Sequence, residues 1–207
     1  GIATISNGKF EIEKKKGRIS ELKNALKSHR DYAGKIGIGH TRWATHGAPN
    51  DINAHPHQSG KFALVHNGII ENYAQLKEQY LKLANFKSET DTEVIVQLLN
   101  RLYSTSCLDA IAKTVKLLEG SFALAILCED EPDKLYCVRQ GSPLLVGVGN
   151  GIFAASDITA ISDMAEIFYR MDDGEIAEIT ESNVNFYNFE LERIEKERCE
   201  FAFEDMR

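Results

Sequence analysis

The sequence predicts an α+β fold in which a pair of sheets is covered by helices. Two helical patterns in the middle of the chain are flanked by many short strand-like segments, without the regular strand-helix alternation of a parallel doubly wound sheet. The 207 residues are 43% hydrophobic, which is enough to bury one sizeable core. Length alone leaves one domain or two small domains open.

The chain is expected to open with a hairpin. Apolar and polar residues alternate over 1–6 and 9–13, on both sides of Asn7-Gly8, a pair that favours the positive φ angles of a tight turn. Apolar residues at helical spacing predict a helix over 19–28. The next expected elements are two strands and a helix, over 36–39, 62–65 and 71–84.

The rest of the chain is expected to form two helices and then strands. Thr90 and Glu93 have capping-box spacing for a helix that continues over 94–102, and a second helix is expected over 108–118. Short β-rich segments separated by turn pairs predict seven strands, over 122–127, 134–139, 144–148, 152–155, 167–170, 175–180 and 184–187. The charge-dense tail from Glu190 is expected to be an exit segment.

Composition argues against two classes of partner. The formal net charge is −7, whereas a protein that binds nucleic acid normally presents a basic face. The longest apolar run has about half a dozen residues, far fewer than the roughly 20 of a membrane helix, and no targeting segment opens the chain. We therefore expect neither a nucleic-acid partner nor a membrane.

The four cysteines lack the short paired spacing of a zinc site. Cys128 and Cys137 lie in apolar segments that read as neighbouring strands, and a buried free thiol is expected for both. Cys107 opens a predicted helix. This usage fits a reducing, cytoplasmic setting better than a disulfide framework.

Four polar-rich blocks follow the ends of hydrophobic runs and cover 40–47, 53–57, 65–72 and 88–93. In the third block, Asn67-Gly68 offers a side-chain amide donor and a backbone N–H with no Cβ in the way, the two parts of an oxyanion hole. The alternative is a plain tight turn, because Asn-Gly is common there. The neighbouring blocks favour one active site.

Two charged residues of the blocks suit the two ends of an amino acid. Arg42 can grip a carboxylate with two parallel hydrogen bonds, and Asp91 at a helix start can accept from an ammonium group. Alternatively, Arg42 pairs with a structural carboxylate and Asp91 only favours the helix dipole. Thr45 and His46 add hydroxyl and turn contacts, and Trp43 either walls the pocket or fills core.

Five of the six histidines fall between His40 and His66, which raises the possibility of a metal site. They lie on separate turns, without an acidic ligand at recognisable spacing and without a His-Glu-x-x-His helix. We therefore expect no metal. His55-Pro56-His57 is interpreted as a rigid loop whose imidazoles hold neighbouring backbone.

In their order and their residues, the four blocks closely resemble the glutaminase domain of the glutamine:fructose-6-phosphate aminotransferase (glucosamine-6-phosphate synthase) family. This family is one of the class II, N-terminal-nucleophile amidotransferases. The resemblance continues through 139–144, 155–157 and 174–177. It implies a four-layer αββα sandwich in which 1–207 is one type-2 glutamine amidotransferase domain, and no cofactor.

The resemblance also implies a mechanism. A cysteine at the processed N-terminus, with its own α-amine as base, attacks glutamine; thioester formation releases ammonia and water then frees glutamate. The roles in this chain fall on Arg42 for the glutamine carboxylate, Asp91 for its amino group, Trp43, Thr45 and His46 for pocket shape, and Asn67 with Gly68 for the oxyanion.

The nucleophile of the family is not found among these residues. The chain opens at Gly1-Ile2-Ala3, which matches a later strand of the family pattern, so we expect an N-terminally truncated domain without its first strand and helix. It is predicted to be inactive alone, because no internal cysteine carries an α-amine or an evident base.

The implied partners are L-glutamine and, in the full-length protein, an isomerase domain that uses the ammonia to convert fructose 6-phosphate to glucosamine 6-phosphate; a homo-oligomer is a further option.

Two other hypotheses stay open. One is a non-catalytic fragment that binds glutamine or docks to a partner. The other is the glutaminase domain of a different class II amidotransferase, which supplies ammonia to another acceptor.

Overall fold

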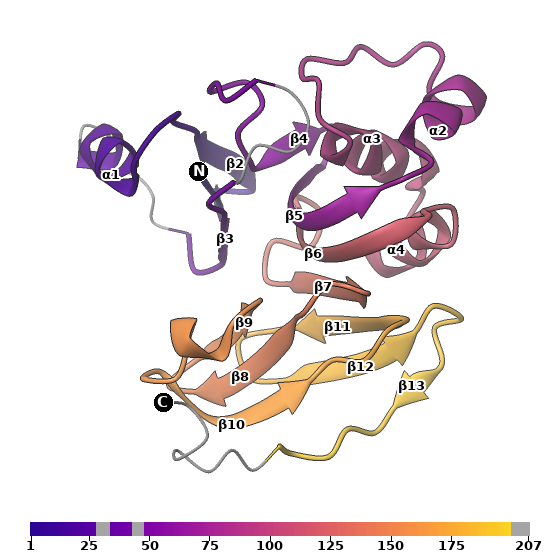
Figure 1. Cartoon of the computed structure of the whole chain (residues 1–207). Coiled ribbons are helices and arrows are strands. Elements are labelled where there is room, and N and C mark those ends of the chain that lie inside the picture. The colour runs from indigo at the N-terminus through magenta and orange to yellow at the C-terminus, as the bar shows by residue number, and fades with distance from the viewer. Residues whose placement is uncertain (28–33, 43–47, 200–207) are drawn as a thin grey trace.

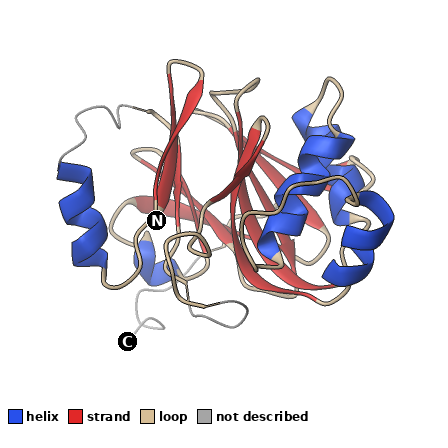
Figure 2. Ribbon diagram, turned by 90° about the horizontal axis from the view of Figure 1, so that it is seen from above, coloured by secondary structure: helices blue, strands red, loops and turns tan. Residues whose placement is uncertain are grey.

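The computed structural model describes residues 1–27, 34–42 and 48–199. Two layers of strands lie between helices (Figures 1 and 2), so the predicted α+β sandwich is confirmed. The larger layer is one seven-stranded sheet, and the second layer consists of two three-stranded sheets. The strand-strand pairs are antiparallel, which agrees with the predicted preference for α+β layers over a parallel doubly wound sheet.

The larger sheet has the strand order β13-β12-β11-β7-β6-β5-β4. Its strands are β4 (His57–Ser59), β5 (Phe62–Ile70), β6 (Gly120–Cys128), β7 (Leu135–Gln140), β11 (Glu175–Ile179), β12 (Val184–Asn188) and β13 (Arg193–Ile194). Strands β5 and β6 pair along their whole length, from Phe62 opposite Cys128 to Ile70 opposite Gly120. This long ladder carries the Asn67-Gly68 pair.

The second layer has the strand orders β2-β1-β3 and β10-β8-β9. Its strands are β1 (Ile2–Ser6), β2 (Lys9–Glu13), β3 (Gly37–Gly39), β8 (Leu145–Gly149), β9 (Ile152–Ala155) and β10 (Ala165–Arg170). A cavity of about 990 Å³ is lined by both small sheets, for example by Ile36 next to β3 and Ile152 in β9, and by Leu135 and Ile179 of the larger sheet.

Alternation along β5 explains how both faces of the larger sheet are buried. Phe62 and Leu64 belong to a core shared with the helices, whereas Ala63 and Val65 belong to a core shared with the second layer. Helices α2 (Tyr73–Tyr80), α3 (Thr92–Leu102) and α4 (Cys107–Val115) cover the first face. On the far side of the second layer lie α1 (Ile19–Lys27) and the short 3-10 helix η1 (Ile158–Ala160), which gives the four-layer order (Figure 2).

The start of α3 explains part of the site. Asp91 is its N-cap, because its side chain accepts from the Thr92 N–H at 3.0 Å. The predicted capping box forms in one direction, since Thr90 Oγ1 accepts from the Glu93 N–H at 3.3 Å. The Glu93 carboxylate accepts instead from two backbone N–H groups of the preceding loop. Across the described ranges, no helix combines the length and apolar character needed to cross a bilayer.

The predicted hairpin and most later elements are confirmed. Asn7 and Gly8 have φ angles of 50° and 73° in the turn between β1 and β2. The seven strands expected after the middle helices all form near their predicted positions.

Three expectations are wrong. Strand β5 runs through Asn67-Gly68 to Ile70 instead of ending at Val65, which also rules out the alternative of a plain tight turn for this pair. His57 begins strand β4, so the rigid loop extends only to Pro56. The tail is more than an exit segment, because β13 pairs with β12 and the Lys196 Nζ lies 2.8 Å from a Glu175 carboxylate oxygen.

The cysteine expectations need one correction. Cys107 and Cys128 are joined by a disulfide between the start of α4 and the end of β6, so Cys128 is not a free thiol. Cys137 is a buried free thiol on β7, next to β6, as predicted. The cysteine pattern therefore gives no support for a reducing setting.

Candidate active site

Residues from all four polar blocks line one cavity of about 400 Å³. Arg42 reaches it from the segment after β3, Asn67 and Gly68 from β5, and Asp91 from the start of α3. The other lining residues are His40, Thr41, His55, His66, Ile69, Thr90, Thr92 and Ser121. The structure thus brings together an arginine, an aspartate and an amide pair that are far apart in sequence.

The open edge of β5 provides backbone donors to this cavity. Strand β4 pairs with β5 only as far as Leu64, and no other strand of the described residues pairs with the later part of that edge. On this edge the His66 N–H donates to His55 Nδ1 at 3.4 Å, and the Ile70 N–H donates to Asp91 Oδ2 at 2.8 Å. Because alternate N–H groups of a strand point the same way, the Gly68 N–H faces the same side, between these two bonds.

Gly68 can only be glycine in this arrangement. Its φ angle is +134°, in a region that residues with a side chain rarely adopt. A Cβ at this position would also clash with the backbone carbonyl of Ser121 on β6. The missing side chain therefore allows both the backbone angle and the close approach of β6.

Asn67 lies on the other face of β5 from His66. It follows Ala63 and Val65 on the face that meets the second layer, but it stands beyond the core and is exposed. Its Oδ1 lies 2.6 Å from Nε2 of His40, the residue after β3. The carboxamide is therefore held by a residue of the other sheet layer.

Asp91 has structural partners and spare acceptor capacity. The residue is buried, and its two oxygens accept from the backbone N–H groups of Ile70 and Thr92. A carboxylate offers about four acceptor positions, so two bonds leave room for a donor in the cavity. Asp91 can therefore cap α3 and accept from an ammonium group at the same time, so the two interpretations of this residue are compatible.

A chain of hydrogen bonds fixes two imidazoles in the wall of the cavity. His55 Nδ1 accepts from the His66 N–H, so a neutral His55 carries its proton on Nε2, which lies 3.2 Å from Thr92 Oγ1. The Thr92 hydroxyl then donates to His66 Nδ1 at 3.0 Å. The expectation that the imidazole of His55 holds neighbouring backbone is confirmed.

Burial keeps these imidazoles neutral at pH 7. Loss of solvation lowers the pKa values of His40 and His55, lowers the pKa of His57 to about 3 and lowers that of His66 to about 4. Within the described ranges, no group of three or more His, Cys, Asp and Glu side chains is arranged to hold a metal ion.

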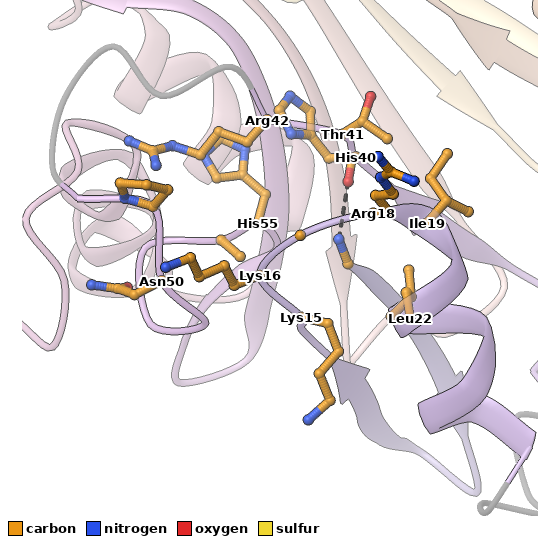
Figure 3. Close-up of a pocket in the computed structure, with 14 residues that line it drawn as sticks. Lys15, Lys16, Arg18, Ile19, Leu22, His40, Thr41, Arg42, Asn50 and His55 are labelled. Atoms are coloured by element: carbon orange, nitrogen blue, oxygen red, sulfur yellow. Dashed lines mark hydrogen bonds between the residues drawn. The ribbon is translucent and has the colours of Figure 1, made fainter.

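Arg42 also borders a second, smaller cavity of about 140 Å³ (Figure 3). His40 and His55 line both cavities, and the smaller one adds Lys15, Lys16 and Arg18. Lys15 Nζ pairs with a Glu13 carboxylate oxygen at 3.3 Å, so the positive charge beside Arg42 comes from Lys16 and Arg18, and it favours an anionic group there.

Some site residues stay predictions, and others were not foreseen. Trp43, Thr45 and His46 lie outside the described residues, so their predicted roles rest on the sequence. His40, His66 and Thr92 were not assigned roles from sequence. The concentration of histidines between His40 and His66 was the available signal, and it marks a hydrogen-bonded wall of the cavity.

Comparison with known proteins identifies the family. A family model described as a glutamine amidotransferase domain matches residues 40–163. The chain is 55% identical over 201 residues to glutamine–fructose-6-phosphate aminotransferase [isomerizing] of Aquifex aeolicus and 48% identical over 202 residues to that of Clostridium acetobutylicum. Each match covers 95% of this chain but 34% and 33% of the relative, so the chain spans about a third of their length.

Solved structures agree with this result. The glutamine phosphoribosylpyrophosphate amidotransferase of B. subtilis superposes with a TM-score of 0.78 at 26% identity, over 93% of this chain and 43% of that one. A glutamine aminotransferase class-II domain protein of Silicibacter pomeroyi has a TM-score of 0.64 at 12% identity, over 91% of this chain and 90% of that one, and shows the shared fold. Strand β5, the start of α3 and the segment that carries Arg42 meet at one cavity. Because the family model also matches more than half of its residues, the chain belongs to the glutamine amidotransferase domain family.

Proposed function

We propose that this chain is the glutaminase domain of a glutamine:fructose-6-phosphate aminotransferase, which releases ammonia from the side-chain amide of L-glutamine. The observation that carries the proposal is the single cavity shared by Arg42, Asp91 and Asn67-Gly68. The 48–55% identity to aminotransferases of that name supports the choice of sugar phosphate as acceptor.

In this proposal the cavity binds both charged ends of glutamine. The guanidinium of Arg42 holds the α-carboxylate, and its basic surroundings strengthen that contact. Asp91 accepts from the α-ammonium with the acceptor positions that its two backbone bonds leave. Trp43, Thr45 and His46 shape the rest of the pocket.

The side-chain carbonyl of glutamine then lies at the edge of β5. A thiolate attacks its carbon, and the carbonyl oxygen becomes an oxyanion that accepts from the Gly68 N–H and the Asn67 carboxamide. Collapse breaks the C–N bond, the nitrogen leaves with a proton as ammonia, and water hydrolyses the thioester to glutamate. One such donor contributes roughly 10²–10³ in rate in comparable sites.

None of the four cysteines of the sequence suits the role of nucleophile. Cys107 and Cys128 form the disulfide, and burial raises the pKa of Cys137 to about 12. The backbone of Cys199 pairs with Phe168 in β10, and none of the four lines the cavity. We propose that the 207-residue polypeptide hydrolyses glutamine no faster than background, and that the nucleophile is provided by further residues of the enzyme.

The remaining parts of the proposal concern the whole enzyme. We propose that residues 1–207 form one glutaminase domain that works with a sugar-phosphate isomerase domain, in a cytoplasmic enzyme that is a candidate homo-oligomer. The ammonia would convert fructose 6-phosphate to glucosamine 6-phosphate.

Two measurements test the function. The full-length enzyme should release glutamate from glutamine and form glucosamine 6-phosphate from fructose 6-phosphate; glutamate release without amino sugar would favour another class II amidotransferase. Calorimetry on the 207-residue chain should detect glutamine binding without product. No cysteine of the chain lines the cavity, so glutamine binding by the 207-residue chain need not lead to hydrolysis. If the chain binds glutamine and the full-length enzyme also releases no glutamate, the non-catalytic module is favoured.

A further inference from the structure

The bond between His40 and Asn67 joins the two sheet layers at the cavity. His40 follows β3 of the second layer, and Asn67 lies on β5 of the larger sheet. His40 Nε2 and Asn67 Oδ1 are 2.6 Å apart. Both residues line the 400 Å³ cavity, so the orientation of the Asn67 carboxamide decides what it presents there.

A carboxamide has two faces of opposite character. Its NH₂ group donates two hydrogen bonds and its oxygen only accepts. If the oxygen is turned to His40, the NH₂ group is left for the cavity and can stabilise a developing negative charge. If the carboxamide is rotated by a half-turn, the oxygen faces the cavity and repels that charge.

We propose that His40 is a positioning residue whose Nε2–H donates to Asn67 Oδ1 and so directs the Asn67 NH₂ group into the cavity. For its effect on catalysis this inference rests on the proposed glutaminase function. The hydrogen bond and its tautomer do not depend on that function and can be tested in the isolated chain.

The surroundings of His40 hold its ring in place. Its backbone N–H donates to the Gly1 carbonyl at 3.0 Å. Its carbonyl accepts from the Gly1 nitrogen at 2.9 Å, the bond dashed in Figure 3. The ring packs on the imidazole of His55, with ring centres 4.3 Å apart and planes at 31°. His55 is fixed in turn by His66 and Thr92. The donor is therefore supported from behind, as a positioning group must be.

The tautomer gives a direct test in the 207-residue chain. With histidine labelled with ¹⁵N at both ring nitrogens, the His40 ring should be neutral near pH 7 with its proton on Nε2. The histidine→leucine variant at position 40 assigns the ring signals. A proton on Nδ1 with Nε2 bare would overturn the proposal, because Nε2 would then accept from Asn67 and the carboxamide oxygen would face the cavity.

A matched pair of variants tests the effect on the reaction in the full-length enzyme. Both lose the imidazole, but His40→Gln keeps an amide N–H at about the reach of Nε2, whereas His40→Leu has no donor. We expect His40→Leu to lower kcat for glutamate release about 10–100-fold with KM for glutamine nearly unchanged, and His40→Gln to recover most of that loss. Equal losses in the two variants would contradict the positioning role.

A double-mutant cycle separates positioning from general damage. In an Asn67→Ala background the carboxamide is gone, so adding His40→Leu should cause little further loss of kcat. If the loss of kcat in the double variant equals the product of the losses in the two single variants, the inference is overturned. His57→Gln is the control, because it removes a buried imidazole that contacts Thr90 and does not line the cavity; melting temperatures confirm that all variants fold.

Failure of the inference and failure of the proposed function are distinguishable. If the unmodified full-length enzyme releases no glutamate, the glutaminase proposal fails, and the ring tautomer in the 207-residue chain still decides the His40 bond. If the enzyme is active but His40→Leu keeps its full kcat, the inference alone fails.

Discussion

Asp91 Oδ2 accepts a hydrogen bond from the Ile70 N–H at 2.8 Å, which ties the start of α3 to the open edge of β5. Its Oδ1 caps the same helix through the Thr92 N–H. A single buried carboxylate therefore joins a helix to a strand and borders the space proposed for glutamine. Changes at this residue should affect folding and binding together.

Asp91→Asn should weaken glutamine binding more than tenfold, because the neutral amide loses the ion pair with the α-ammonium. It should also lower the free energy of unfolding by about 1–2 kcal/mol, since an amide offers one oxygen where two now accept. Calorimetry and urea denaturation measure the two effects. Ser106→Ala is the matched control: it removes the N-cap of α4, so it should cost about 1 kcal/mol and leave glutamine affinity unchanged. Unchanged affinity in Asp91→Asn would reject the ammonium contact.

Gly68→Ala should lower the free energy of unfolding by about 3 kcal/mol, because a left-handed backbone angle and a clash with Ser121 act together. Gly174→Ala is the matched control, since Gly174 has φ +81° and no neighbouring atom lies within 4 Å of the position that a Cβ would take. It should cost about 1 kcal/mol from the backbone angle alone. Chemical denaturation of both variants gives the comparison, and equal costs would show that β6 can move away from β5.

Stability should fall as the pH is lowered from 7 to 5. The folded pKa values of His57 and His66 are lowered to about 3 and about 4, below the value of about 6.5 in an unfolded chain. At pH values between the folded and the unfolded pKa, the histidines of the unfolded chain bind protons that those of the folded chain do not. Lowering the pH in this window therefore favours unfolding. Each of the two histidines contributes about 2 kcal/mol between pH 7 and pH 5. Urea titrations at both pH values measure this, and His57→Gln should reduce the difference by that amount; an unaltered pH dependence would mean that the pKa of His57 is the same in the folded and unfolded states.

The disulfide predicts thiol counts. After denaturation without reductant, two thiols, Cys137 and Cys199, should react with a thiol reagent, and all four cysteines should react after reduction. Because the bond closes a sequence separation of 21 residues, its removal in Cys128→Ala should cost about 3 kcal/mol in chain entropy, apart from the cavity left in the core. Cys137→Ala leaves a comparable cavity without breaking a bond and serves as the control. Four reactive thiols before reduction would contradict the pairing.

Local patterns predicted most elements of the fold. Asn7-Gly8 and the strand-turn spacing after residue 120 are short-range signals, and the hairpin and the later strands follow them. The length of β5 was not predictable in this way. Asn67-Gly68 has the local preference of a turn, but pairing with β6 along nine residues outweighs it.

For the site, the sequence predicted which charged and amide groups matter but not what holds them. The binding chemistry of Arg42, Asn67 and Asp91 follows from each side chain alone. The support of Asn67 by His40 is a contact between two sheet layers, and the His55-Thr92-His66 chain joins a loop, a helix and a strand. Such contacts depend on tertiary packing, and a sequence pattern shows only that histidines are concentrated there.

The alternation along β5 limits how this segment can vary in length. Deleting or inserting one residue between Phe62 and Gly68 would transfer the glycine amide to the opposite edge and turn the asparagine toward the helices. Two residues would restore the direction but move both groups by about 7 Å along the strand. Turns such as Asn150-Gly151, between β8 and β9, carry no such restriction, so length variation among related sequences should be confined to turns and excluded from this strand.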